Sequence, residues 1–561
     1  TENSRRYSKK NSVKFSVRGG KSDYKVYLPA SALLSKLRID PINKQGEIAF
    51  SELSAWKVSS FSRTKYSSAF SADNLSDLKQ IEKITRIRDD YIVFSSVGKD
   101  PSFVIDKLAK DGEHEEYQPF LLIVIGTVMF LVITIIRAMR AGLSEQDQNK
   151  WCISFIVFIF LLLKMTYYND NVAFGVPPDE RAHYQYAMHL ESEGLLIPDF
   201  GNMMIDGVKN NNYLSHSPLY YHMGNILFTN KSVAAWRTFN NYLILLSFFL
   251  VLVVVHKYYR LDFFQHLFII TAFSSLPMLA FIGASINNDG LGILSGGLFF
   301  FGVHSYFLDK QYRRGANTIV LALFLAYFSK LTVFLLVSFS FIGLLAQFKM
   351  RCYKIFVSTY IYAVFVALFI ISYQVFIINK YGAIIPSLKV TNPDAYYHFG
   401  FFVPEDLRIS FTPVEWFFRM LQCFWESYFN IYAHVSLVKP LDWISYIIIF
   451  THVAGFGILF YPADKGSEKI LKSMLYAIIV VVMIQYGWSY VGRQSSGYTG
   501  GLQARYYLPF SMVLPFSASI VLSRLIKHRI RNLIYLLLVM CLIYGDFIYF
   551  MLHTTEQLRF L

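Results

Sequence analysis

The pattern of hydrophobic and polar positions changes at about residue 118. Before that point, short runs such as residues 24–28 and 91–94 alternate apolar and polar side chains, and turn-forming residues such as those at 40–46 separate the runs. Alternation with a period of two is typical of strands with one buried face. We therefore predict a small β-sandwich within residues 1–118. The first ~20 residues are basic and poor in apolar side chains, and we predict a disordered tail there.

After residue 118 the chain carries long apolar runs of about 16–24 residues, the length that crosses the hydrocarbon core of a bilayer as a helix. We predict an α-helical polytopic membrane domain over 119–561 with about twelve transmembrane helices. The two helices beside Lys330 are short and fit one broken helix equally well. The predicted spans are 119–137, 151–168, 237–256, 264–284, 290–308, 316–329, 331–347, 355–378, 441–461, 471–488, 506–523 and 533–552.

Basic residues collect in alternate short loops between these spans, for example Arg137 and Arg140 after the first span and Lys349 and Arg351 after the seventh. Loops rich in Lys and Arg stay on the cytoplasmic side. The intervening loops, chiefly 169–236 and 379–440, then face outward, together with residues 1–118. No signal-peptide-like segment opens the sequence, so export of this domain requires an upstream span or another route.

Composition agrees with a membrane location. The chain is 54% hydrophobic and only 16% charged, whereas an ordinary soluble domain has about 25% charged residues. The formal net charge of +15 is explained by cytoplasmic loops that contact anionic headgroups. The sequence contains no nucleic-acid-binding motif, and we expect no nucleic-acid partner.

The strongest candidate chemistry lies in the first outward loop, where Asp179 and Glu180 follow Pro177 and Pro178. A carboxylate at the membrane surface can accept a proton from an acceptor hydroxyl. Acidic residues after Pro at a helix start are also typical of capping. The spacing alone does not separate these two interpretations.

Two cations lie at the predicted outward ends of spans: Lys330 within a long apolar stretch, and Arg505 before Tyr506 and Tyr507. Ionisable groups at membrane depth are costly and usually functional. Arg offers a bidentate fork and Lys a point charge for a phosphate. The alternative is that both side chains snorkel to the headgroups. We favour function for Lys330 and leave both interpretations open for Arg505.

His183 lies four residues after Asp179, on the same helical face. An Asp and a His at this spacing can bind a divalent cation, but no third ligand is evident, so we assign no metal and favour hydrogen bonding to substrate. His216 lies in the same loop and could line an acceptor site. Asn288 and Asp289 lie at an outward helix junction. N-capping accounts for Asp289, and we favour it over a role in the site.

These motifs, in this order, resemble the glycosyltransferases of the GT-C type, and most closely a bacterial multi-span family catalogued as a domain of unknown function. The resemblance covers about residues 150–523. It also includes an amino-terminal segment, 37–41, that resembles a β-domain found with bacterial polysaccharide enzymes. The segments that carry the main resemblance are 175–184, 284–289, 329–332 and 503–509.

The resemblance implies a catalytic base at Asp179, with Glu180 as its orienter or as an alternative base. It further implies a donor-phosphate site at Lys330, Arg505 and Tyr506. The remaining substrate-binding candidates are His183, His216, Asn288, Asp289 and Gln503.

The function implied is an inverting glycosyltransferase in the bacterial cytoplasmic membrane, which moves a sugar from a polyprenyl-phosphate donor to a glycan acceptor on the outer face. A polymerase or ligase of lipid-linked glycans would share these features. A transporter or flippase is the third alternative, although the sequence has no convincing internal repeat and its carboxylates lie in a loop. The aromatic segment 413–429 is too short and charged to span, and we predict an interfacial helix that could cover the donor, although Glu426 stands where the resembled family tends to place a Gly.

Overall fold

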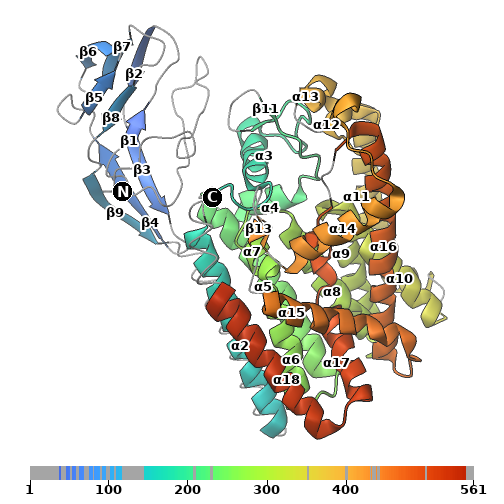
Figure 1. Cartoon of the computed structure of the whole chain (residues 1–561). Helices are drawn as coiled ribbons and strands as arrows, with labels where there is room; N and C mark the ends of the chain where they lie inside the picture. The colour runs from blue at the N-terminus through green and yellow to red at the C-terminus, as the bar shows by residue number, and fades with distance from the viewer. Residues whose placement is uncertain are drawn as a thin grey trace. The chain divides into compact units, whose positions relative to one another are not determined.

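The computed structural model describes residues 145–550 with short gaps, together with nine strands between residues 37 and 116 (Figure 1). The chain divides into two compact units, of which one is formed mainly by residues 1–129 and the other by most of the remainder. Each unit is described by itself. The gaps are 173, 206–209, 228–231, 350–352, 399–401, 430, 433–436, 439–441 and 499–501.

In the amino-terminal unit, the described strands form three antiparallel sheets of three strands each, in the orders β1-β8-β5, β2-β7-β6 and β3-β4-β9. The alternating segment 91–94 lies within one of these strands, whereas segment 24–28 lies outside the described residues. The packing of the sheets into a sandwich remains a prediction. The strands are β1 (Leu37–Ile39), β2 (Gly46–Phe50), β3 (Leu53–Val58), β4 (Ser62–Ser68), β5 (Leu75–Lys79), β6 (Ile81–Arg88), β7 (Tyr91–Ser96), β8 (Ser102–Ile105) and β9 (Ala109–Glu116).

The second unit is helical and has the character of a multi-pass membrane protein. Its described part holds six helices long and apolar enough to cross a membrane, or up to eight if two bent helix pairs each count as one span. The six are α2 (Glu145–Asn171), α5 (Val233–Tyr258), α8 (Asp289–Phe307), α11 (Tyr353–Tyr381), α16 (Gly466–Ser496) and α18 (His528–Leu542), which continues as the π-helix η6 (Ile543–Phe550).

Helices occur at every predicted span from 151–168 onward, whereas the span 119–137 lies outside the described residues. The count of about twelve crossings therefore stays a prediction. The other helices at predicted spans are shorter or more polar: α9 (Tyr312–Ser329), α10 (Leu331–Gln347) and α15 (Asp442–Phe456), which is followed by η4 (Gly457–Phe460).

The bent pairs place irregular backbone near helix ends. Helix α6 (Phe263–Ser274) meets α7 (Pro277–Gly283) at 54°, and η5 (Ala504–Phe510) meets α17 (Val513–Leu525) at 65°. Pro277 begins α7, where its missing N–H costs nothing. The chain is also broken at Lys330, whose extended backbone (φ −151°) separates α9 from α10.

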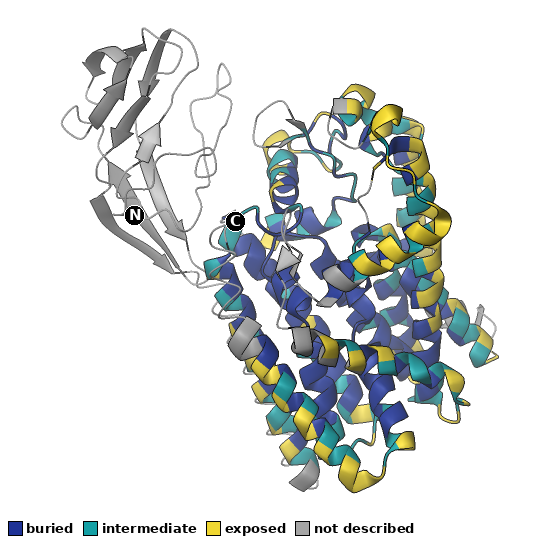
Figure 2. Ribbon diagram, viewed as in Figure 1, coloured by how far each residue is buried: buried dark blue, intermediate teal, exposed yellow. Residues whose placement is uncertain are grey.

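Helix α8 lies at the centre of the bundle and is buried along almost its whole length, as Figure 2 shows. Two glycines allow close approach: a Cβ at Gly296 would lie 2.1 Å from the Pro509 carbonyl oxygen, and one at Gly297 would lie 2.5 Å from Ser247 Oγ. Small residues at such crossings are typical of membrane helices. Gly296 thereby lets η5 pack directly on α8.

The outer helices expose apolar side chains, among them Phe365 and Leu368 of α11 and Leu537 of α18. Such faces suit contact with lipid tails. A buried ion pair joins α2 to η6, since Lys164 Nζ lies 2.5 Å from Asp546 Oδ2 and both side chains are at most 5% exposed. Charges inside the bilayer are usually paired in this way.

Short elements connect the helices in the segments predicted to face outward. In α14, Trp416 and Met420 are buried while Val414 and Phe418 are exposed, as expected of an interfacial helix. The elements are α3 (Glu180–Glu193), β10 (Met204–Ile205), β11 (Asn210–Asn211), α4 (Leu219–Leu227), α12 (Leu388–Thr391), α13 (Pro393–His398), η3 (Glu405–Leu407), α14 (Pro413–Phe429), β12 (Ile431–Tyr432) and β13 (Leu437–Val438).

Candidate functional site

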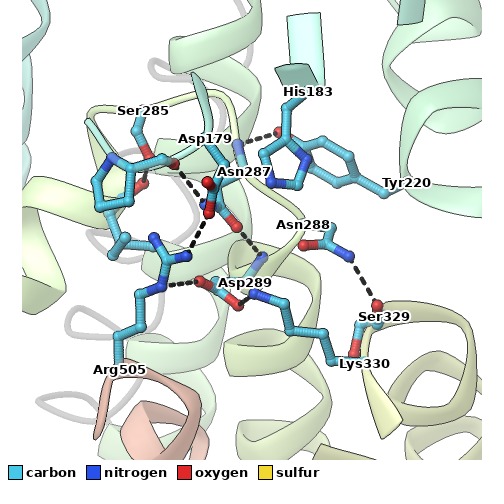
Figure 3. A network of polar contacts seen from close by, with 12 residues as sticks. Asp179, His183, Tyr220, Ser285, Asn287, Asn288, Asp289, Ser329, Lys330 and Arg505 are labelled. Carbon is cyan, nitrogen blue, oxygen red and sulfur yellow. Dashed lines mark hydrogen bonds and ion pairs between the residues drawn. The ribbon is translucent and has the colours of Figure 1, made fainter. Parts of the chain in front are cut away.

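Two acids and two bases from distant parts of the chain meet in one group, which we call the charged cluster: Asp179, Asp289, Lys330 and Arg505 (Figure 3). Asp179 precedes α3, Asp289 begins α8, Lys330 separates α9 from α10, and Arg505 lies in η5. Each residue is at a helix end or a break. The cluster therefore forms where backbone irregularity lets charged side chains approach each other.

Asp179 has a left-handed backbone (φ 62°), which is uncommon for a residue other than glycine. Glu180 lies in the first turn of α3 and Asp179 takes the N-cap position, but the Asp179 side chain makes no capping hydrogen bond to this helix, so side-chain capping does not account for Asp179. Instead, Arg505 Nη2 donates to Asp179 Oδ2 at 2.7 Å, and the Tyr213 hydroxyl donates to Oδ1. The left-handed turn directs the carboxylate into the cluster.

The protonation of Asp179 is set by opposing effects. Burial alone would raise the pKa of Asp179, but the Arg505 charge and the Tyr213 hydrogen bond together hold it well below its usual range. Asp179 is therefore a carboxylate at neutral pH. About a quarter of its side chain is exposed (23%), so it has access to a ligand.

Asp289 is not an N-cap, contrary to the interpretation that we favoured. It occupies the first turn of α8, and its Oδ1 accepts from Lys330 Nζ at 2.5 Å while Oδ2 lies 3.4 Å from Arg505 Nε. Asn288 takes the cap position without a capping hydrogen bond, and its Nδ2 donates to the Ser329 carbonyl at 2.7 Å. This last bond ties the start of α8 to the break at Lys330.

Neither cation snorkels toward headgroups, because both are buried within the protein: the side chain of Arg505 is 1% exposed and that of Lys330 is 9% exposed. Both lie over the ring of Tyr506, with Lys330 Nζ at 4.4 Å and Arg505 Cζ at 5.5 Å from its centre. Among the described residues, Arg505 Nε and Nη1 have no hydrogen-bond partner. Buried donors without a hydrogen-bond partner are rare in folded proteins.

His183 and His216 stack on each other beside the cluster, with ring centres 5.7 Å apart. His183 Nδ1 lies 2.7 Å from the Tyr221 hydroxyl, and its buried Nε2 has no hydrogen-bond partner in the part of the chain that is described. Burial lowers the pKa of His183 well below its usual value and, with the Lys330 charge, lowers that of His216 to about 3. Both rings are therefore neutral.

Glu180 is directed away from the cluster. Arg237 binds it through two hydrogen bonds, Nε to Oε1 at 2.7 Å and Nη2 to Oε2 at 2.8 Å. The backbone N–H groups of Gly175 and Ile286 also donate to this carboxylate. With its side chain fully buried, Glu180 is a structural group, and we do not carry forward its assignment as orienter or alternative base.

Gln503 precedes Arg505 by two residues, and its buried Oε1 has no hydrogen-bond partner among the described residues. Three contributors were missed from sequence. Asn287 accepts from the Asp289 N–H at 2.9 Å and donates to the Pro178 carbonyl at 3.3 Å. No sequence motif around Tyr213 indicates a role in the site. Arg237 could have been found, because a charge at the start of an apolar span is costly without a partner.

Comparison with protein-family models and with curated proteins gives no match. The described residues contain no group of three or more His, Cys, Asp or Glu side chains that could hold a metal ion. The charged cluster contains two cations balanced by two carboxylates, and two nitrogens of Arg505 have no hydrogen-bond partner among the described residues. This set is suited to binding an anion next to a group that gives up a proton.

Proposed function

We propose that the protein is an inverting glycosyltransferase of the GT-C type that transfers a sugar from a polyprenyl-phosphate donor to a hydroxyl of a glycan acceptor, on the outer face of the bacterial cytoplasmic membrane. One observation carries the proposal. Arg505 is a buried guanidinium, two of whose nitrogens have no hydrogen-bond partner within the described structure, and its Nη2 lies 2.7 Å from a partly exposed carboxylate, Asp179. Phosphate binding and proton removal would thus occur side by side.

In this mechanism Arg505 and Lys330 hold the donor phosphate, and Asp179 accepts the proton of the acceptor hydroxyl. The acceptor oxygen forms a bond to the anomeric carbon as the bond from that carbon to the phosphate oxygen breaks. The electron pair leaves with the phosphate, whose negative charge the two cations stabilise. One displacement of this kind inverts the configuration of the anomeric carbon.

Several buried polar atoms near the cluster have no hydrogen-bond partner in the described structure: His183 Nε2, Asn288 Oδ1 and Gln503 Oε1. A sugar presents both donors and acceptors, and it would supply the partners that these atoms lack. His216 would extend this set toward the acceptor. We assign no metal ion to the reaction, with a divalent cation as the alternative.

The charge of the cluster favours a monophosphate donor over the diphosphate used by a polymerase or ligase. Two cations face two carboxylates, so the unliganded cluster is close to neutral. It would take up the charge of one phosphate more readily than that of two. The amino-terminal strands would bind the growing glycan, and α14 would cover the lipid part of the donor.

The proposal is tested by replacing Asp179 with Asn in the full chain. We expect transfer from the lipid donor to fall by about 10²–10⁴-fold, the contribution typical of a general base. The measurement is the sugar content of the surface glycan in cells that depend on the variant, together with its quantity in the membrane. Asp199→Asn is the matched control, since Asp199 is an exposed acid paired with Lys380. Normal glycan with Asp179→Asn at normal levels would refute the assignment.

A further inference from the structure

We propose that the donor phosphate draws Arg505 away from Asp179, so that this carboxylate becomes an effective base only when the donor is bound. The inference rests on the proposed function. It assigns Arg505 two alternating partners, an internal carboxylate and the lipid phosphate, and it sets the order of events: donor first, then activation of the acceptor.

The geometry of Arg505 supports two partners. Only Nη2 makes a hydrogen bond to a carboxylate, the one to Asp179 at 2.7 Å, whereas Nε is 3.4 Å from Asp289 and Nη1 has no hydrogen-bond partner in the described part of the chain. A phosphate can accept two parallel bonds from the guanidinium fork. The phosphate thus competes with Asp179 for the same group.

Lys330 does not replace Arg505 at Asp179, because its Nζ is bound to Asp289 at 2.5 Å. When Arg505 turns to the phosphate, Asp179 loses the cation that donates to its Oδ2. Tyr213 still donates to Oδ1 and keeps the carboxylate in place. Tyr213 is therefore a positioning residue for the base.

The loss of this cation changes the proton affinity of Asp179. Its pKa is low because Arg505 and Tyr213 outweigh the effect of burial. The other titratable groups near Asp179 in the described residues include the His183 and His216 rings, both neutral, the Tyr221 and Tyr498 hydroxyls, whose pKa values are raised, and the Lys330–Asp289 pair. Weakening the Arg505 contact therefore raises the proton affinity of the carboxylate.

The step balances without another reactant. The acceptor O–H bond breaks and its proton passes to Asp179, while the new glycosidic bond forms and the phosphate leaves with the electron pair. After the lipid phosphate departs, Arg505 pairs with Asp179 again and the proton is released to water. Without donor, Asp179 holds Arg505 and an acceptor hydroxyl is not activated.

The experiment measures the affinity of the full-length protein in nanodiscs for undecaprenyl phosphate. Because Asp179 competes for Arg505, Asp179→Asn should bind this probe roughly fivefold more tightly than the native protein. Asp199→Asn should bind it as the native protein does. Undecaprenol, which lacks the phosphate, should bind native protein and Asp179→Asn equally.

Unchanged or weaker binding of undecaprenyl phosphate by Asp179→Asn would overturn the inference. The proposed function would still stand if that variant had lost transfer, so the two failures are distinguishable. Tyr213→Phe is the second variant and is used if Asp179→Asn does not fold. It removes a donor that competes with Arg505 for Asp179, so it should weaken phosphate binding, and tighter binding would contradict the inference.

Discussion

Asp179 and Glu180 are neighbours in sequence, and each is bound by a buried arginine, yet the two ion pairs differ in how completely their hydrogen bonds are formed. We call Glu180 with Arg237 the structural pair. Arg237 donates to both oxygens of Glu180 and to the Asn169 carbonyl. Two backbone N–H groups donate further hydrogen bonds to the Glu180 carboxylate. In the charged cluster, Arg505 makes one hydrogen bond to a carboxylate, and its Nε and Nη1 have no hydrogen-bond partner among the residues that the structure describes.

This difference in hydrogen bonding distinguishes the structural pair, which stabilises the fold, from the charged cluster, which is suited to bind a ligand. A buried donor without a partner costs about 1–3 kcal/mol. The structural pair avoids this cost, and it joins α3 to α5 and to the segment just before α8. The charged cluster carries the cost of these unpartnered donors, and a bound phosphate would remove this cost by accepting their hydrogen bonds.

The largest expected effect is on the structural pair. Arg237→Met leaves the fully buried Glu180 without its cation, and we expect a loss of about 3–5 kcal/mol in the free energy of unfolding. Fluorescence-detected size exclusion after a heating series would measure the shift in Tm.

Lys380→Met is the control for this change, because Lys380 pairs with Asp199 at an exposed site, 3.2 Å apart. Exposed pairs contribute about 0–1 kcal/mol. Equal shifts in Tm for Arg237→Met and Lys380→Met would mean that the structural pair does not support the fold.

A smaller effect separates the two arginines by function. Arg505→Lys keeps the charge but loses the planar fork, so transfer should fall by about 10–100-fold while Tm changes little. Arg237→Lys should do the opposite, lowering Tm while each folded molecule retains its activity. Glycan transfer per quantity of folded protein, measured for both variants, decides between these outcomes, and a shared pattern would remove the distinction between the pairs.

The smallest effect concerns pH. The folded-state pKa of His216 is about 3, below the unfolded value of about 6.5. Between these values the unfolded chain binds a proton that the folded protein does not, so stability falls as pH drops below about 6.5. For His216 alone we expect up to about 2 kcal/mol of loss by pH 5.

The native protein and His216→Asn should therefore differ in the slope of Tm against pH between about 5 and 7.5, with the variant showing the shallower dependence. His222→Asn is the control, since His222 lies in the same segment and bonds the exposed Leu196 carbonyl. The same slope for His216→Asn and the native protein would show that His216 does not stay neutral in the folded state.

Much of the helical architecture could be predicted from the sequence. The apolar runs from residue 151 onward all contain helices, because a helix is the form in which a single segment satisfies its own backbone in lipid. The break at Lys330 follows from a charge within an apolar stretch. The number of crossings stays a prediction, since α9 and α10 are short and segment 119–137 lies outside the described residues.

The site residues were predicted by type, but their contacts were not. Asp179, Asp289, Lys330 and Arg505 were candidates, and the structure brings them together. The capping role that we favoured for Asp289 was wrong, and so was the alternative of snorkelling that we left open for the two cations. Both are local interpretations, and partners more than forty positions away in the sequence replace them.

By itself the sequence determined where the chain is apolar enough for a membrane and which few charged residues such a chain retains, because the cost of burying charge acts on each residue alone. Only the tertiary structure decided which acid meets which arginine. Asp179 and Glu180 have the same local surroundings, but the left-handed backbone at Asp179 directs it to Arg505 while Glu180 begins α3 and faces Arg237. Which acid pairs with which arginine depends on their positions in space, and the neighbouring residues in the sequence do not determine these positions.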